Sequence, residues 1–243
     1  MLSSFTGSFW AGRRSSGAST FLVTDNLVLH LDASDPGSYP GTGTTWFDLS
    51  GIGNDATLMN GAAYSADNSG VIVLGNDLVN DYIAVPNDNT LSPSSSQSIT
   101  LQIWVKFSEF QAGAYIFRKS VLLEYNYDGY YLFADTNGSY RALTNGTSIQ
   151  KTHNAAGTLN TDTWYFLTFI TNITNIAGST KIYNGITETY SGFHGTDGYS
   201  EAGELLLASG LTGQVGAMYT YQKALSTVEI EQNYHATKTR FGL

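Results

Sequence analysis

Short runs of alternating apolar and polar residues recur along the chain. The clearest is "SITLQIWVKF" (98–107), and "LVLHLD" (27–32) and "WYFLTFIT" (164–171) follow the same period. A period of two places successive side chains on opposite faces of a strand, one of which is buried. Similar runs lie at 71–74, 82–85, 114–117, 121–125, 130–134, 180–183, 205–208 and 215–221. The pattern therefore predicts many short β-strands.

Pairs of Asn or Asp with Gly separate several of these runs. Such pairs adopt the positive φ angles that tight hairpin turns require. They lie at 128–129, 137–138, 145–146, 184–185 and 197–198. Short strands joined by turn signals at regular spacing are typical of a β-sandwich or jelly roll.

One segment has a different pattern. In "LSTVEIEQNYHATK" (225–238), Ser226 is followed three residues later by Glu229, which is the pattern of a capping box. This predicts a short helix over 226–238.

Composition supports an all-β domain and excludes several function classes. The 243 residues are 42% hydrophobic and 13% aromatic, which suits strands, and the absence of cysteine excludes disulfides and thiolate metal sites. The formal net charge is −9, and no basic stripe is present that would bind a nucleic acid. No run of about 18 apolar residues is present that would span a membrane.

Three segments, in this order, resemble a known fold family. They are "LVLHLDASDPGSYPGTGTTWFDLSGIGNDATLMNG" (27–61), "SITLQIWVKF", and "LTGQVGAMYTYQKALSTVEIEQNYHATKTRFGL" (211–243). These are similar to the opening, the central strand and the closing strand and helix of laminin-G-like, concanavalin A-like lectin and glucanase domains. The resemblance implies an all-β, concanavalin A-like β-sandwich (jelly roll) with one short C-terminal helix. The amino-acid sequences of these segments also resemble domains in structural proteins of tailed bacteriophages.

We expect an extended N-terminal arm over residues 1–20 and a laminin-G-like jelly-roll domain over residues 21–243. The arm lacks the charged start and apolar stretch of a secretory signal. Large aromatic side chains on a flexible segment can anchor a protein to a partner, and Arg side chains add polar contacts. The predicted anchoring residues are Phe5, Phe9, Trp10, Arg13 and Arg14. A disordered tail is the alternative interpretation of this segment.

The segment "DLSGIGNDATLMNG" (48–61) has the glycines of a ligand-binding loop. A phosphate loop is excluded because no Lys–Ser/Thr pair at a helix start follows the glycines. Asp48, Asn54 and Asp55 are candidate calcium ligands, but their spacing matches no dedicated calcium loop. The resemblance implies a structural turn, which is the interpretation we favour. We therefore expect no cofactor, with Ca²⁺ as the alternative.

The sequence lacks a catalytic pattern. Glucanases of the resembling fold carry alternating acidic residues on a strand, with two carboxylates close together. The nearest match, Glu229-Ile230-Glu231, lies in the predicted helix, and Glu201 and Glu204 lie in a Gly-rich loop. The four His residues are scattered. We therefore predict that the protein is not an enzyme.

Two function classes remain. The first is a non-enzymatic structural protein at the virion surface, such as a capsid decoration, head fibre or tail component. Its arm would bind other virion proteins, and it would also adhere to host cell-surface glycans. The alternative is a carbohydrate-binding module or adhesin of a bacterial surface protein. Because aromatic rings stack on sugars, the candidate glycan contacts are Trp104, Tyr127, Tyr130, Tyr140 and Tyr199.

Overall fold

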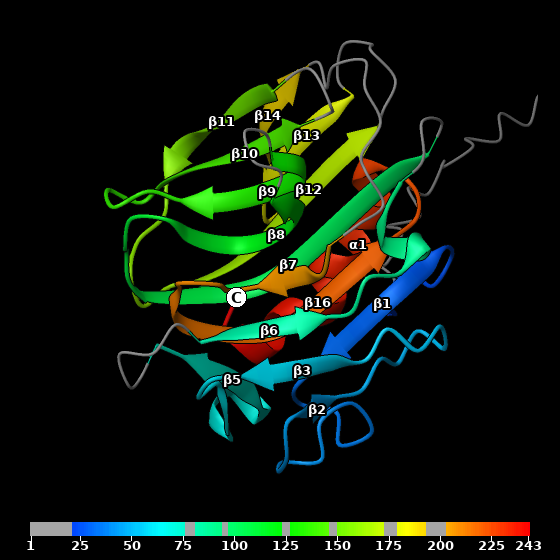
Figure 1. The fold of residues 1–243 in the computed structure, drawn as a ribbon, viewed down its shortest axis with the longest axis vertical. Coiled ribbons are helices and arrows are strands. Elements are labelled where there is room, and N and C mark those ends of the chain that lie inside the picture. The colour runs from blue at the N-terminus through cyan, green and yellow to red at the C-terminus, as the bar shows by residue number, and fades with distance from the viewer. Residues whose placement is uncertain are drawn as a thin grey trace, which may run out of the picture.

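The alternating runs form strands that hydrogen-bond into two antiparallel sheets, stacked face to face (Figure 1). The computed structural model describes residues 21–75, 81–93, 97–122, 127–145, 150–172, 179–192 and 203–243. The predicted β-sandwich is confirmed. The predicted arm, residues 1–20, lies outside the described residues.

Sheet I contains eight strands among the described residues, in the order β14-β13-β12-β7-β16-β5-β4, with β1 also beside β16. Strand β16 is long enough for two neighbours on one side, because residues 213–215 pair with β5 and residues 217–221 pair with β1. The strands are β1 (Leu27–Asp32), β4 (Ala63–Ser65), β5 (Val71–Leu74), β7 (Ser98–Glu109), β12 (Trp164–Asn172), β13 (Thr180–Asn184), β14 (Thr187–Gly192) and β16 (Thr212–Tyr221).

Sheet II has the order β11-β10-β9-β8-β15-β6-β3-β2 among the described residues. Its strands are β2 (Thr45–Trp46), β3 (Ala56–Met59), β6 (Tyr82–Val85), β8 (Ala114–Leu122), β9 (Tyr127–Ala134), β10 (Ser139–Asn145), β11 (Gln150–Thr158) and β15 (Leu205–Leu207). Figure 1 shows this sheet nearest the viewer.

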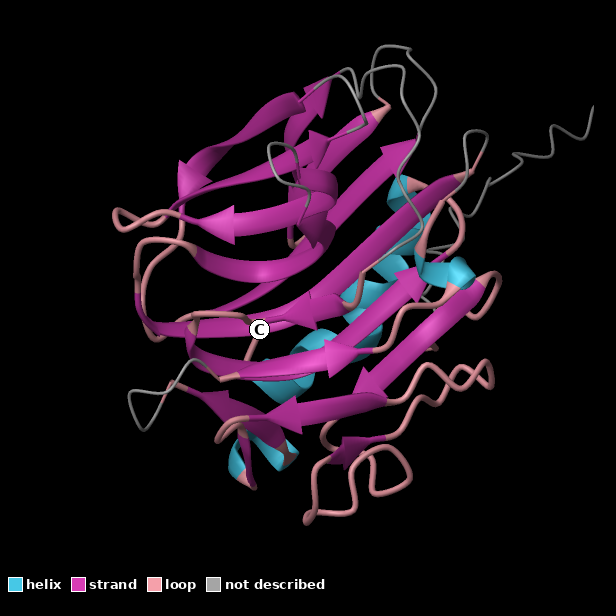
Figure 2. Cartoon of the chain, in the orientation of Figure 1, coloured by secondary structure: helices cyan, strands magenta, loops and turns pink. Residues whose placement is uncertain are grey.

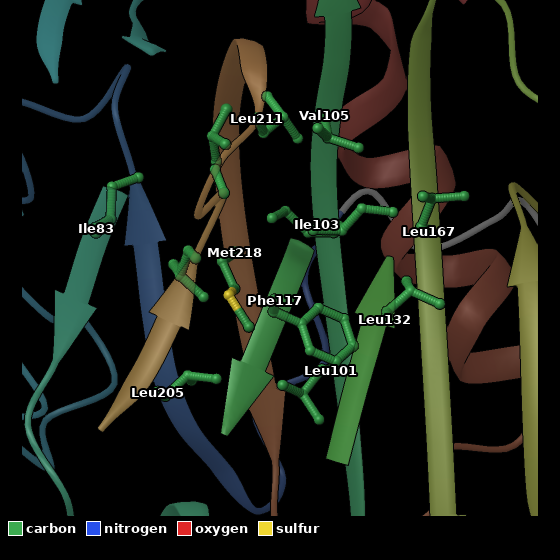
Figure 3. Packing of buried hydrophobic residues seen from close by; sticks show 14 of the residues in the cluster. Ile83, Leu101, Ile103, Val105, Phe117, Leu132, Leu167, Leu205, Leu211 and Met218 are labelled. Carbon is green, nitrogen blue, oxygen red and sulfur yellow. The ribbon is translucent and has the colours of Figure 1, made fainter. Parts of the chain in front are cut away.

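The main hydrophobic core lies between the two sheets. In β7, the five apolar residues of the predicted buried face, Ile99, Leu101, Ile103, Val105 and Phe107, are fully buried in it. Figure 3 shows side chains from both sheets pointing into this core, including Phe117 and Leu132 of sheet II. The period of two therefore identified the buried face correctly.

A second core covers the outer face of sheet I. Helix α1 (Thr227–Thr237) begins at Ser226, where the predicted capping box is present, and the 3₁₀ helix η3 (Lys238–Phe241) follows it. Ile230 and Phe241 of this segment pack against Trp104 and Phe166 on the outer face. In Figure 2, α1 lies behind the strands, on the far side from sheet II. Strand β7 is consequently buried on both faces.

No described helix has the length and hydropathy needed to cross a membrane. Besides α1 and η3, the described helices are the short 3₁₀ turns η1 (Asp67–Ser69) and η2 (Asn89–Leu91).

The predicted turns are only partly confirmed. Residues 137–138 join β9 to β10, and residues 184–185 join β13 to β14. The turn predicted at Asp128–Gly129 was wrong, because both residues lie within β9. There Gly129 pairs with Ser120 and Asn145, so pairing with two neighbouring strands overrides the local turn preference. Residue 145 ends β10, and residues 146 and 197–198 lie outside the described part of the chain.

A buried lysine joins two loops to sheet II. Lys119 of β8 is 4% exposed, and its Nζ donates to Asn87 Oδ1 at 2.6 Å and to the Gly203 carbonyl at 2.7 Å. Burial lowers the pKa of Lys119 to about 8, because desolvation disfavours the charged ammonium, although the nearby Asp88 opposes this shift.

We expect Lys119 to make stability depend on pH. Between about pH 8 and pH 10, the amine is neutral in the folded chain and protonated in the unfolded chain. The free energy of unfolding should therefore rise with pH across this window, by about 2 kcal/mol from this group. Urea unfolding at several pH values gives the free energy of unfolding of the wild type and of Lys119→Met. The contribution of Lys119 is the difference between their pH dependences. An equal pH dependence in both proteins would contradict the lowered pKa.

Candidate functional site

Three of the predicted glycan contacts are buried. Trp104 is 0% exposed, Tyr130 1% and Tyr140 2%. Tyr130 and Tyr140 point into the main core, where the Tyr130 hydroxyl donates to the Leu91 carbonyl at 2.8 Å, and Trp104 lies beneath α1. The prediction was wrong for these three residues, because no ring face is accessible to a ligand.

The other predicted binding residues stay predictions. The side chain of Tyr127, in β9, lies outside the described residues, and so does Tyr199. The same holds for the anchoring residues of the arm, Phe5, Phe9, Trp10, Arg13 and Arg14.

A different set of aromatic residues lies on the outer face of sheet II. Tyr131 and Phe133 of β9 alternate with the core residues Tyr130 and Leu132, so they point away from the core. Tyr115 of β8 lies beside them, with its ring centroid 5.9 Å from that of Tyr131 and 6.0 Å from that of Phe133. Tyr115 and Phe133 are partly exposed, whereas Tyr131 is 3% exposed.

Two guanidinium groups complete this cluster. The Cζ of Arg118 lies 5.2 Å from the centroid of the Tyr115 ring, and that of Arg141 lies 4.6 Å from the centroid of Phe133. These distances are typical of cation–π contacts. We call this surface the aromatic face, defined by Tyr115, Arg118, Tyr131, Phe133 and Arg141.

Strand register positions the aromatic face. Phe133 is paired with both Tyr115 and Arg141, and Tyr131 is paired with both Arg118 and Leu143. Neighbouring strands lie about 4.8 Å apart, so the face extends roughly 10 Å from β8 to β10. No described helix lies in front of β8, β9 and β10 (Figure 2). The partly exposed members of the face, Tyr115, Arg118, Phe133 and Arg141, therefore present ring surface and hydrogen-bond donors.

The alternation in β9 carried the signal that sequence reasoning missed. In "YYLFA" (130–134), Leu132 and Ala134 are core residues, and Tyr130 shares their phase. The residues in the opposite phase, Tyr131 and Phe133, were the correct ones to place on the outer face. The sequence analysis chose aromatic residues without first assigning which positions of β9 face the core. It therefore chose Tyr130, whose ring is buried.

The 48–55 loop is a structural turn centred on one carboxylate. Asp48 Oδ1 accepts hydrogen bonds from the backbone N–H groups of His30, at 2.8 Å, and Ser50, at 2.9 Å. Its Oδ2 accepts from the Ser50 hydroxyl at 2.7 Å, and from the backbone N–H groups of Gly53 at 3.1 Å and Asn54 at 3.0 Å. Five protein donors thus use both oxygens of Asp48.

The two other candidate metal ligands also hold the loop together. Asp55 Oδ1 accepts from the Asp48 backbone N–H at 2.8 Å, and Asn54 Nδ2 donates to the Val28 carbonyl at 2.8 Å and to Thr90 Oγ1 at 3.0 Å. This arrangement does not fit a calcium site, which needs several oxygens directed at one ion. In the described part of the chain, no cluster of three or more His, Asp or Glu side chains could hold a metal.

The acidic residues considered for catalysis have other roles or positions. Glu229 accepts hydrogen bonds from the Ser226 backbone N–H and hydroxyl, and Lys223 Nζ lies 2.6 Å from its Oε1. It therefore holds the start of α1. Ile230, between Glu229 and Glu231, is buried, as expected for a helix. Glu201 lies outside the described residues.

Comparison with known protein families agrees with this fold. A family model named Laminin_G_3, described as the concanavalin A-like lectin/glucanases superfamily, matches residues 74–231, more than half of the chain. The chain belongs to this superfamily. No curated protein sequence matches it. Membership in the superfamily establishes the fold, and the side chains on that fold must establish the function.

Several solved structures share the superfamily fold at low sequence identity. The binding domain of Paraclostridial Mosquitocidal Protein 1 has a TM-score of 0.68 and 15% identity, over 87% of this chain and 52% of that one. Botulinum neurotoxin type C, from a structure concerned with two ganglioside molecules, has a TM-score of 0.66 and 15% identity, over 88% and 52%. This chain therefore spans about half of each toxin chain.

One similar structure is matched over almost its whole length. It is domain 4 of AbnA, an extracellular arabinanase from Geobacillus stearothermophilus, in complex with arabinotriose. The TM-score is 0.64 and the identity 18%, over 86% of this chain and 98% of that domain.

The Asp48 turn predicts a large difference between two Asp variants. Asp48→Ala removes an acceptor of five hydrogen bonds and should lower the free energy of unfolding by about 3 kcal/mol or more. Asp55→Ala removes the acceptor of the Asp48 backbone N–H and should cost about 1 kcal/mol. Urea unfolding measures both. A calcium-dependent rise in melting temperature that Asp48→Ala abolishes would instead make this loop a metal site.

Proposed function

We propose that this chain is a non-enzymatic glycan-binding module that holds an oligosaccharide on the aromatic face. The observation that carries the proposal is the pairing of partly exposed rings, Tyr115 and Phe133, with the guanidinium groups of Arg118 and Arg141. The apolar C–H faces of sugar rings pack on aromatic side chains, and sugar hydroxyls accept hydrogen bonds from guanidinium groups. Together these groups match the two kinds of surface that a sugar presents.

The position of the face favours an extended oligosaccharide over a small buried ligand. It lies on a sheet surface that no described helix covers, and the rings come from two neighbouring strands. A chain of sugars laid across β8, β9 and β10 would contact rings and guanidinium groups in succession. Such a surface leaves both ends of the ligand free.

The carboxylate beside the face supports binding without hydrolysis. Asp135 Oδ1 lies 3.0 Å from Arg141 Nη2, so this carboxylate is already paired with a cation. Most glycoside hydrolases use two carboxyl groups facing each other across the bond that is cleaved. None of the five residues that define the aromatic face carries a carboxyl group.

The structural similarities support a glycan ligand to different degrees. The AbnA domain was solved with arabinotriose, and nearly its whole length is matched by this chain. The botulinum neurotoxin type C chain is matched over about half its length, so its gangliosides are weaker support.

The location of the protein is a separate prediction. We propose a place on the surface of a tailed-bacteriophage virion, as a capsid decoration, head fibre or tail component anchored to other virion proteins by residues 1–20. The resemblance of the sequence to phage structural domains supports this. The alternative, an adhesin of a bacterial surface protein, would use the same aromatic face.

We expect two aromatic substitutions to weaken glycan binding. Tyr115→Ala and Phe133→Ala each remove a partly exposed ring, and each should raise the dissociation constant about tenfold. The wild type is first tested on a glycan array, and the best oligosaccharide is then titrated into each variant by calorimetry.

Phe21→Ala serves as the matched control. Phe21 is 76% exposed, and its carbonyl accepts a hydrogen bond from Gln232 of α1, which lies over the outer face of sheet I. This variant should bind like the wild type. Full affinity in both aromatic-face variants would show that the glycan binds elsewhere, and the absence of any bound glycan on the array would refute the proposal.

A further inference from the structure

The two guanidinium groups of the aromatic face differ in how their charge is compensated. Arg141 is paired with Asp135, and the two side chains are 39% and 35% exposed. Arg118 packs over the Tyr115 ring but has no carboxylate partner within the described residues. Among the described residues, the face therefore carries one positive charge, at Arg118, that no carboxylate pairs with.

The position of Arg118 lets a ligand reach this charge and the rings together. Arg118 is paired with Tyr131 across β8 and β9, and Leu206 of β15 is paired with Arg118 on the other side. Tyr115 lies on the same outer face of β8, with its ring under the guanidinium group. Because the guanidinium group covers one face of the Tyr115 ring, a sugar would pack against the exposed part of this ring, with its substituents beside Arg118.

We propose that the ligand of the aromatic face is an acidic oligosaccharide, in which the carboxylate of a sugar acid pairs with Arg118. This inference rests on the proposed function and specifies the class of sugar. The planar guanidinium group donates two parallel hydrogen bonds to a carboxylate, and charged pairs of this kind are about twice as strong as neutral ones. Neighbouring sugar rings pack against the exposed parts of Tyr115 and Phe133, and Arg141, already paired, donates to neutral hydroxyls.

The net charge of −9 does not oppose this assignment. At about 0.15 M salt, charges more than about 8 Å apart across solvent are largely screened. A bound carboxylate therefore interacts mainly with the groups that touch it. Within the described part of the chain, those groups are Arg118 and aromatic rings.

The test uses pairs of probes that differ only in charge. Trigalacturonate and 3′-sialyllactose are each compared with their carboxyl-reduced forms, in which a primary alcohol replaces the carboxylate. Calorimetry at about 0.15 M salt, where surface charges are screened, gives the ratio of affinities for the acidic and reduced forms. The wild type should prefer the acidic form of at least one probe by about tenfold or more.

Arg118→Gln should abolish this preference and leave binding of the reduced form nearly unchanged. Arg118→Lys keeps the charge but not the planar fork, and should keep a reduced preference. Lys106→Gln is the matched control, because it removes a cation that packs over the Trp164 ring in sheet I, and it should behave like the wild type. Thermal unfolding confirms that each variant is folded. If Arg118→Gln is not folded, a preference in Arg118→Lys equal to that of the wild type would overturn the proposal.

Each outcome decides between the two proposals. Equal affinity for acidic and reduced forms, or a preference that survives Arg118→Gln, would overturn the acidic-ligand proposal. The glycan-binding proposal would stand if Tyr115→Ala still weakened binding of a neutral glycan. If no glycan bound at all, both proposals would be wrong.

Discussion

The packing of Trp104 against the C-terminal segment determines which surfaces of the sandwich are buried. Its ring lies 4.2 Å from Phe241 and 5.9 Å from Tyr234, centroid to centroid, and its Nε1 donates to Thr237 Oγ1 at 2.8 Å. This packing requires Gly216 in β16, because a Cβ there would lie 2.6 Å from the Phe241 ring. The outer face of sheet I is thereby converted into a second core.

The aromatic face is a consequence of this asymmetry. Sheet I is buried on both sides by sheet II and by α1 with η3, whereas no described helix covers the outer face of β8, β9 and β10. Aromatic residues on sheet I therefore contribute to stability. Two that point outward from sheet II, Tyr115 and Phe133, are partly exposed. The role of an aromatic residue thus depends on whether a helix or a second sheet covers the face on which it lies.

The sequence predicted the positions of strands and helices better than it predicted which side chains are exposed. Strands with clean alternation, such as β1 and β7, and the capped helix α1 were found almost to the residue, because their signals are local. Strands β10 and β11 were missed, since "SYRALTN" and "QKTHNAAGT" contain few apolar residues. The exposure of Trp104 could not be predicted from its strand, because the helix that covers it follows more than 100 residues later. The error at Tyr130 was different, because its alternation with Leu132 and Ala134 already indicated in the sequence that it faces the core.

The contacts between Arg side chains and aromatic rings also bear on how a ligand would bind. A free Arg side chain loses rotamer freedom when it is fixed by a ligand, which weakens binding. Arg118 and Arg141 are already packed on Tyr115 and Phe133, so part of this entropic cost is met during folding. The contact with a ring also restricts where each guanidinium group can lie. Selectivity then depends on which acceptor group the fork meets, and a carboxylate satisfies two parallel donors where a single hydroxyl cannot.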